Sequence, residues 1–287
     1  MSQVITPMTK KINEIQSYLL AMRRPVEDSA SPYSSRNSSK GALLTEAKIL
    51  FSYLAKGNSL DSARQAIFED NIFAKKTHQT RKRCWEILHS RYFSQQEDLE
   101  KIHPIIALFR SNASEKIKQG VLYYHFAISD LFSYEVTTEL IYDLYRRGLT
   151  NIAPRDIHEF LDLRKKGRPE INKWSPQTRL SLASHYLSAM RDFGILEGKN
   201  QKRIHRPTVE EDLFLYILTY LRDCCKSPRS ILANEDFKLF LLSQQEVESK
   251  LLETQRNGRI KFQKAGHIVS LELPWRSILE YIANVGQ

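Results

Sequence analysis

The residues of this chain that are best suited to binding chemistry are its cations, which are concentrated between residues 164 and 206. That stretch holds eleven lysine and arginine residues against three acidic residues, a net charge of +8, while the whole chain carries +10. A local cluster of positive charge is the electrostatic signature of a phosphate-binding surface. A single basic run is more often only a solvated face, but here the charge coincides with a predicted helix and hairpin. We therefore predict contact with nucleic acid.

The predicted contacts in this stretch fall into two groups. Phosphate contacts are expected before and after the helix, at Arg164, Lys165, Lys166, Arg168, Lys199, Asn200, Gln201, Lys202 and Arg203. An α-helix fits the major groove, where base edges are exposed. Base contacts are therefore expected from the start of the helix, at Ser175, Gln177, Thr178, Arg179 and Ser181.

A second basic edge lies at the start of another predicted helix. Its residues are Lys75, Lys76, Thr77, His78, Gln79, Arg81 and Lys82. Three short helices over residues 43–93, with the last one basic at its N-terminus, are consistent with a DNA-binding helix-turn-helix. A plain helical bundle has the same pattern, so both interpretations stay open here.

Catalytic motifs are not found in the sequence. It contains no phosphate-binding G-x-x-x-x-G-K-[ST], no dinucleotide-binding G-x-G-x-x-G, no H-E-x-x-H and no G-x-S-x-G. The eight histidines are dispersed, and none stands at i, i+4 from another histidine or a cysteine. We predict no enzymatic activity, no metal site and no cofactor.

The basic stretch must be positioned by two helices and a hairpin. Ser175 is an N-cap residue, Pro176 suits the first helical position, and Gly194 suits a left-handed C-cap. The apolar residues of this helix recur at helical spacing, at Leu180, Ala183, Leu187 and Met190. Pro154 opens the preceding helix, and residues 195–204 form a short hairpin. Helix, helix and basic hairpin in this order predict a winged helix.

The fold class predicted for the whole chain is mostly α. We expect helical-bundle or helix-turn-helix units, winged-helix-like units and two short β-hairpins. The predicted domains are an N-terminal helix with a mobile Ser-rich linker (1–41), a helical domain (42–150), the basic winged-helix-like unit (151–209) and a C-terminal winged-helix-like unit (210–287). The aromatic residues between 123 and 145 fall at helical spacing, which favours core packing over base stacking.

The C-terminal unit repeats the winged-helix outline. It contains predicted helices over 213–224 and 230–242, a third helix over 244–256 that opens on the capping box Ser243–Glu246, a hairpin that turns at 264–266 and a closing helix over 275–283. Its third helix carries Glu246, Glu248 and Glu253, and carboxylates repel phosphate. This unit is therefore better suited to hold the architecture or a protein partner.

Composition limits the setting in which the protein works. No apolar stretch approaches the ~20 residues that span a bilayer, and the N-terminus has no signal-peptide pattern. Three cysteines form neither a disulfide framework nor a zinc set. We expect a cytoplasmic protein that does not contact a membrane.

A set of motifs is spread between about Asn71 and Leu273: Lys76-Thr77-x-x-Thr80-Arg81 with Arg91-Tyr92, Leu149-Thr150 through Ile157-x-x-Phe160-Leu161, Trp174-Ser175-x-x-Thr178, Arg191 to Leu196, and the hairpin from Gly258 to Gly266. With these motifs the chain resembles the BrxA family, the small non-enzymatic component of BREX bacteriophage-exclusion systems. Residues 1–41 look like an addition to the family. The resemblance implies a helical, NusB-like, cytoplasmic phage-defence protein that acts with a methyltransferase, a phosphatase-like protein and ATPases.

Together these observations predict a non-enzymatic accessory protein that binds duplex DNA through its basic winged-helix-like unit. Two alternatives stay open. A protein–protein adaptor would direct the basic face toward an acidic surface of another BREX component. A NusB-like protein would bind RNA.

Overall fold

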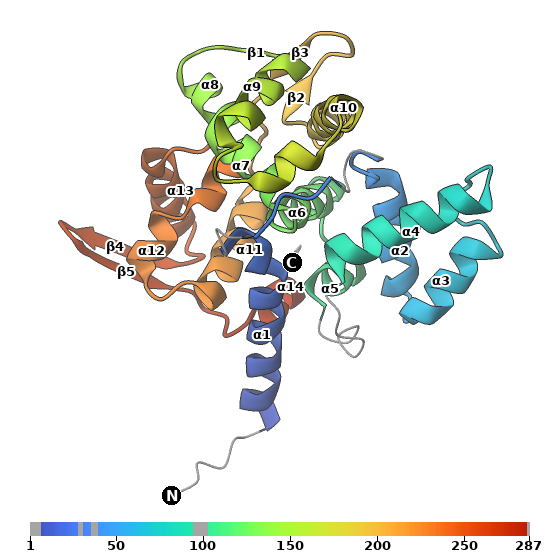
Figure 1. Ribbon diagram of the computed structural model, residues 1–287. Helices are drawn as coiled ribbons and strands as arrows, with labels where there is room; N and C mark the ends of the chain where they lie inside the picture. Colours follow the sequence, from blue (N-terminus) through green and yellow to red (C-terminus); the bar gives the residue numbers. More distant parts are fainter. Residues whose placement is uncertain (1–6, 28–30, 36–39, 94–102, 286–287) are drawn as a thin grey trace, which may run out of the picture.

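The centre of the molecule is formed by two helices, α6 (Glu115–Ile128) and α11 (Glu211–Cys224), which are buried on all sides over residues 121–128 and 213–221. In α11 every residue from Leu213 to Leu221 is buried, which is expected of a helix that is apolar around its whole circumference. The computed structural model describes residues 7–27, 31–35, 40–93 and 103–285, and Figure 1 shows the two helices at its centre. The chain is mostly helical, as predicted.

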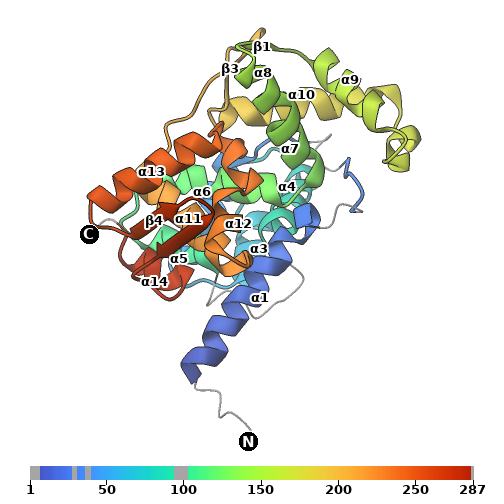
Figure 2. The same cartoon turned by 90° about the vertical axis from the view of Figure 1, so that its left-hand side faces the viewer.

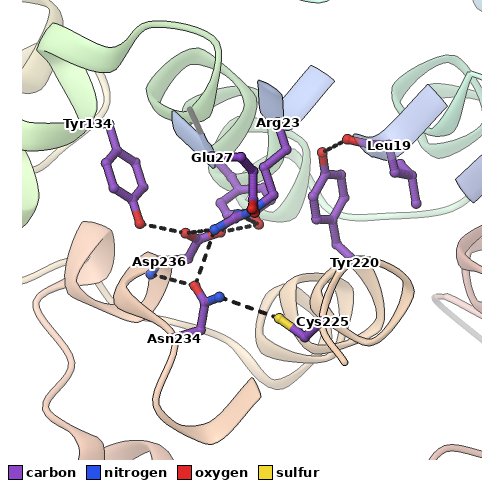
Figure 3. A network of polar contacts seen from close by, with 9 residues as sticks. Leu19, Arg23, Glu27, Tyr134, Tyr220, Cys225, Asn234 and Asp236 are labelled. Carbon is purple, nitrogen blue, oxygen red and sulfur yellow. Dashed lines mark hydrogen bonds and ion pairs between the residues drawn. The ribbon is translucent and has the colours of Figure 1, made fainter. Parts of the chain in front are cut away.

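The N-terminal helix α1 (Pro7–Glu27) packs against this centre. It buries Ile15, Tyr18, Leu19 and Met22, while its N-terminal end projects from the body (Figures 1 and 2). Tyr220 of α11 donates a hydrogen bond to the carbonyl of Leu19 at 2.8 Å, a contact visible in Figure 3. The helix is thus an integral part of the core.

The three helices predicted over 43–93 are confirmed as α2 (Leu44–Ala55), α3 (Leu60–Phe68) and α4 (His78–Tyr92). Ser59 and Thr77 cap α3 and α4 through their hydroxyl oxygens. The short helix α5 (Pro104–Arg110) packs on α2. These elements lie on the right of Figure 1.

A helical stretch with a wide middle turn leads from the body to the basic unit. It consists of α7 (Leu131–Glu135), the π-helix η3 (Val136–Ile141) and α8 (Tyr142–Arg146). Thr137 and Thr138 donate hydrogen bonds to the carbonyls of Ser133 and Tyr134, four residues earlier. A sequence pattern of period 3.6 does not distinguish such a π-helical turn, and it was not predicted.

The basic stretch forms a compact helix–hairpin unit at the top of Figures 1 and 2. Its elements are β1 (Asn151–Ile152), α9 (Pro154–Arg164), the 3-10 helix η4 (Pro169–Lys173), α10 (Pro176–Asp192), β2 (Leu196–Glu197) and β3 (Lys202–Ile204). The predicted hairpin is confirmed, with Leu196 opposite Ile204. The sequence analysis missed β1, which pairs with β3 and extends the hairpin to a three-stranded antiparallel sheet.

The first helix predicted for the C-terminal unit, over 213–224, is confirmed as α11, and the structure departs from the prediction at the second helix. In place of one helix over 230–242 there are α12 (Pro228–Leu232) and the 3-10 helix η5 (Glu235–Phe240), since Asn234 caps η5 and interrupts the α-helix. The capping box of α13 (Gln244–Arg256) is confirmed. The second hairpin consists of β4 (Lys261–Ala265) and β5 (Ile268–Glu272), so its turn is Gly266–His267 rather than 264–266. Helix α14 (Ile278–Ala283) follows it.

The buried apolar side chains of all these elements form one connected cluster. It includes Tyr123, Tyr124, Phe126 and Phe132, which confirms that these rings pack in the core. It also includes Tyr33, so the prediction of a mobile linker is wrong at that residue. The domain boundaries proposed from the sequence stay a prediction.

Candidate nucleic-acid interface

Helix α10 presents a polar N-terminal half on the outside of the helix–hairpin unit. The hydroxyl of Ser175 accepts a hydrogen bond from the Thr178 amide at 3.1 Å, which caps the helix as predicted. The Gln177 side-chain amide donates to Ser181 at 3.2 Å, so both side chains lie on one exposed face. Leu180 was predicted on the apolar face, but it is 46% exposed because the buried stripe runs through Leu182, Ala183, Tyr186 and Leu187.

Two of the predicted phosphate ligands, Arg164 and Arg168, are bound to carboxylates of the body. Arg164 pairs with Glu135 at 3.3 Å and with Glu139. Arg168 pairs with Glu135 at 2.7 Å and donates a second hydrogen bond to the carbonyl of Ser31. Both arginine side chains are largely buried. Their role in the free protein is therefore to attach the α9–η4 segment to the body.

Arg179, predicted to contact a base, points from α10 toward α9. Its guanidinium pairs with Asp162 and donates to the carbonyl of His158 at 3.4 Å. Lys165 pairs with the same Asp162 carboxylate at 2.8 Å, and these two pairs lower the pKa of Asp162 below its usual value. Arg179 thus joins the two helices, and its contact with a base stays a prediction.

Five other cations of the stretch have no ion-pair partner among the residues that the structure describes: Lys166, Lys173, Lys199, Lys202 and Arg203. All of them except Lys202 are exposed. Lys166 and Lys173 lie between α9 and α10, and Lys199 and Arg203 lie in the hairpin. These exposed cations flank α10 on both sides, the placement expected for phosphate contacts.

The hairpin turn is shaped by Gly198 and Lys202. The ammonium group of Lys202 donates to the carbonyls of Gly198, at 3.0 Å, and Lys199. Burial and the nearby Arg191 lower the pKa of Lys202. Gly198 has φ +86°, and a Cβ there would lie 2.1 Å from the carbonyl oxygen of Gln201, so only glycine fits. Lys202 therefore stabilises the turn in which Lys199, Asn200 and Gln201 are exposed.

The remaining predicted turn residues, Asn200 and Gln201, are exposed at the hairpin tip. They line a surface cavity of about 630 Å³ together with Lys202, β1 and the first residues of α9. The cavity wall includes Arg155, which is 83% exposed, and Asp156, whose carboxylate accepts the Ala153 amide at the start of α9. The cavity thus lies between the tip of the hairpin and the start of α9, and its lining is both polar and apolar.

The second basic edge, at the start of α4, contains both structural and free cations. Lys75 pairs with the largely buried Glu46, and Arg81 donates to the carbonyl of Phe68 at 2.7 Å. Thr77 is the N-cap of α4. His78, Gln79, Lys76 and Lys82 are exposed, and the two lysines have no ion-pair partner among the described residues. This edge therefore offers a weaker basic surface than the helix–hairpin unit.

The C-terminal hairpin carries balanced charges. Lys261 pairs with Glu272 at 3.1 Å, and Lys264 pairs with Glu248 of α13. These pairs leave little net positive charge on β4 and β5. In the part of the chain that the structure describes, no group of three His, Cys, Asp or Glu side chains could hold a metal ion. Nor does any described helix combine the length and apolar character needed to cross a membrane.

Comparison with known proteins identifies the family. A family model for BrxA matches residues 31–220, about two thirds of the chain. The chain belongs to the BrxA family. The BrxA match includes the segment around Tyr33, α2 to α11 and the entire helix–hairpin unit. Residues 31–41, interpreted from the sequence as an addition to the family, thus belong to the matched region, whereas the C-terminal hairpin lies outside it.

A crystal structure of an uncharacterized protein from Magnetospirillum magneticum is similar to this BrxA-family chain. It has a TM-score of 0.55 and 14% sequence identity, and the similarity covers 73% of this chain and 99% of that one. At this identity the similarity supports the fold alone. A search of the curated proteins gave no match.

Sequence reasoning missed the acidic partners of the BrxA-matched unit, Glu135, Glu139 and Asp162. The Asp162–Lys165 pair has a helical i, i+3 spacing that could have indicated it. Glu135 lies 29 and 33 residues before its two arginines, and no local pattern joins them. Of the eleven cations counted in the sequence, six are paired: Arg164, Lys165, Arg168, Arg179, Arg191 and Arg206.

Proposed function

We propose that this BrxA-family chain is a non-enzymatic DNA-binding component of a BREX phage-defence system, and that the helix–hairpin unit is a winged helix. The observation that carries the proposal is the placement of Lys166, Lys173, Lys199 and Arg203. They are exposed and unpaired among the described residues, and they flank α10 on both sides. Family membership supports the assignment to a BREX system.

The order of elements supports the winged-helix interpretation. A helix (α8) is followed by β1, two helices and a hairpin whose second strand pairs with β1. In the proposed complex, α10 enters the major groove with Gln177, Thr178 and Ser181 facing the bases. The hairpin contacts phosphate through Lys199 and Arg203. Such contacts orient the protein on the duplex but do not read its sequence. The α4 edge adds Lys76 and Lys82 as a second phosphate contact.

Duplex DNA is favoured over single-stranded RNA by the position of the aromatic rings. Recognition of single strands depends on exposed rings that stack on bases, whereas the central tyrosine and phenylalanine rings, Tyr123, Tyr124, Phe126 and Phe132, are buried. We propose that the protein acts in the cytoplasm, beside the other BREX components.

A titration of the purified protein with duplex DNA, single-stranded DNA and RNA at two salt concentrations tests the function. We expect duplex DNA to bind without nucleotide or metal ion, and the affinity to fall steeply with salt because neutralised phosphates release counterions. Absence of binding at low salt would reject the proposal in favour of a protein–protein adaptor, and preference for RNA would favour a NusB-like activity.

A further inference from the structure

Four polar side chains from three distant segments meet at one junction beneath the helix–hairpin unit. Glu135, at the end of α7, accepts the hydroxyl of Tyr33 and pairs with Arg164 and Arg168. The guanidinium of Arg168 lies over the ring of Tyr33, 4.8 Å from its centroid. We refer to Tyr33, Glu135, Arg164 and Arg168 as the Glu135 junction. The carboxylate of Glu135 in α7 thus connects the segment around Tyr33 with the end of α9 and with the residues between α9 and η4.

The segment around Tyr33 forms a strap across this connection. Its backbone is held at two points, since the Tyr33 amide donates to Glu170 of η4 at 2.6 Å and the Ser31 carbonyl accepts from Arg168 at 2.7 Å. The ring of Tyr33 is buried and packs edge-on against Phe132 at 5.7 Å. The strap therefore attaches η4 directly to the core of the body.

The junction lies close to α10. Helix α10 begins directly after η4, and Phe132, which contacts Tyr33, also contacts Tyr186 of α10 at 5.5 Å. Glu135 is the last residue before the π-helical turn η3, and Glu139 within that turn binds Arg164 from the same side. Apart from these polar contacts, the α9–η4 connection is attached to the body by few buried side chains, because only Ile171 of η4 is buried.

We infer that Glu135 is a positioning residue, which holds the helix–hairpin unit in the one orientation that lets α10 and the hairpin engage DNA together. This inference rests on the proposed function. The arginines of the junction would then contribute to DNA binding through orientation and not through contact with phosphate. The two roles can be distinguished by measurement. Loss of a phosphate contact changes the salt dependence of DNA affinity, whereas loss of an orienting contact does not.

The test compares Glu135→Gln with Asp143→Asn in the full-length chain. Both changes remove one negative charge from the same helical stretch, and among the described residues Asp143 forms its one ion pair with the exposed Arg147. If the loss of a negative charge were the only effect, both variants would bind DNA slightly more tightly, because carboxylates repel phosphate. A positioning role instead predicts that Glu135→Gln alone weakens binding. If the correct orientation is populated in about a tenth of the molecules, the dissociation constant rises about tenfold with an unchanged salt slope.

Two further measurements separate this inference from the proposed function. Hydrogen exchange of the free protein should accelerate in α9 and α10 of Glu135→Gln but not of Asp143→Asn, and this readout requires no DNA. The exchanged pair Glu135→Arg with Arg168→Glu should recover both exchange protection and affinity relative to either single change. If Glu135→Gln binds DNA as tightly as Asp143→Asn, or exchanges at the wild-type rate, the positioning role is refuted. If the wild type binds no DNA, the proposed function fails, and hydrogen exchange alone then decides whether Glu135 holds the orientation of the unit.

Discussion

The guanidinium of Arg23 and the carboxylate of Asp236 form a buried ion pair between α1 and η5, 213 residues apart in the sequence (Figure 3). One of its hydrogen bonds, from Nη2 to Oδ1, measures 2.8 Å. Asp236 is fully buried and also accepts the hydroxyls of Tyr124, at 2.5 Å, and Tyr134, at 2.8 Å. Arg23, Tyr124 and Tyr134 thus all donate to the Asp236 carboxylate. Of these three donors, Arg23 of α1 is the one with a positive charge.

Replacement of Arg23 by methionine should destabilise the protein strongly. Removal of one partner of a buried pair leaves the other charge uncompensated, at a cost of about 3–5 kcal/mol. Urea unfolding of Arg23→Met should show this loss. Lys238→Met is the matched control, because Lys238 pairs with Glu235 on the surface of the same 3-10 helix, and an exposed pair contributes ~0–1 kcal/mol. Equal midpoints for the two variants would show that α1 is not held by this pair.

Two buried histidines should make the protein sensitive to acid. Burial lowers the pKa of His103 to about 4 and that of His125 to about 3. Both stay neutral in the folded state while the unfolded chain takes up protons below the usual pKa of about 6.5. The unfolding free energy should therefore be independent of these groups above that pH. It should fall by about 1.4 kcal/mol per pH unit for each histidine as the pH drops toward 4.

The variant His125→Phe tests this sign. It keeps an aromatic ring beside Tyr220 and removes the titrating group. The unfolding free energy should be measured between pH 7 and pH 4 and plotted against pH. The slope for the variant should be smaller than that of the wild type by nearly the amount that one bound proton contributes, about 1.4 kcal/mol per pH unit. An unchanged slope would show that His125 does not control the acid sensitivity. The absolute stability is not the readout, because Tyr216 loses its hydrogen-bond partner in this variant.

Local signals in the sequence were sufficient to predict most of the helices. Ser175 with Pro176, and Ser243 with Glu246, are caps whose geometry depends on residues at most three positions apart. Gly194 ends α10 at φ +84°, as predicted from its position after the apolar pattern. These features are encoded by neighbours in the chain, and the structure confirms them.

Features that depend on distant partners could not be predicted in the same way. The charge count treated Arg164, Arg168 and Arg179 as available cations, but their carboxylates come from α7, η3 and α9. The strand β1 has two residues, which is too short for an alternating pattern, and it exists because β3 provides its partner. The sequence thus identified a basic region whose contact with nucleic acid stays a prediction, while the roles of its individual arginines required the fold.

Replacement of Gly198 by alanine should distort the hairpin turn. Gly198 has φ +86° and a Cβ would lie 2.1 Å from the Gln201 carbonyl, while Gly57 has φ +91° and open space around it. Gly57→Ala therefore reports the cost of the backbone conformation alone, about 1 kcal/mol. Gly198→Ala should lose more stability and also weaken DNA binding, because Lys199 and Arg203 are displaced. Identical thermal shifts for the two variants would contradict the steric role of Gly198.

The last prediction distinguishes cations that contact phosphate from cations that hold the fold. Lys199→Ala and Arg203→Ala remove exposed hairpin cations with no ion-pair partner among the described residues, so they should leave stability unchanged. Each should weaken binding to all sequences similarly and lower the salt slope by about one unit. Arg179→Ala removes the link between α10 and Asp162. It should lower the melting temperature, leave the salt slope unchanged and raise the pKa of the Asp162 carboxyl toward its usual value.

Salt-dependent binding isotherms and thermal melts of these three variants provide the comparison. Gln177→Ala serves as a fourth variant, because the one hydrogen bond of its exposed amide to a described residue is to Ser181. A base contact at Gln177 should cost roughly 1–3 kcal/mol on a preferred sequence and nothing on others. If Arg179→Ala lowers the salt slope while Lys199→Ala and Arg203→Ala do not, then DNA displaces Asp162 from Arg179. The phosphate-binding surface would in that case be the α9–α10 face and not the hairpin.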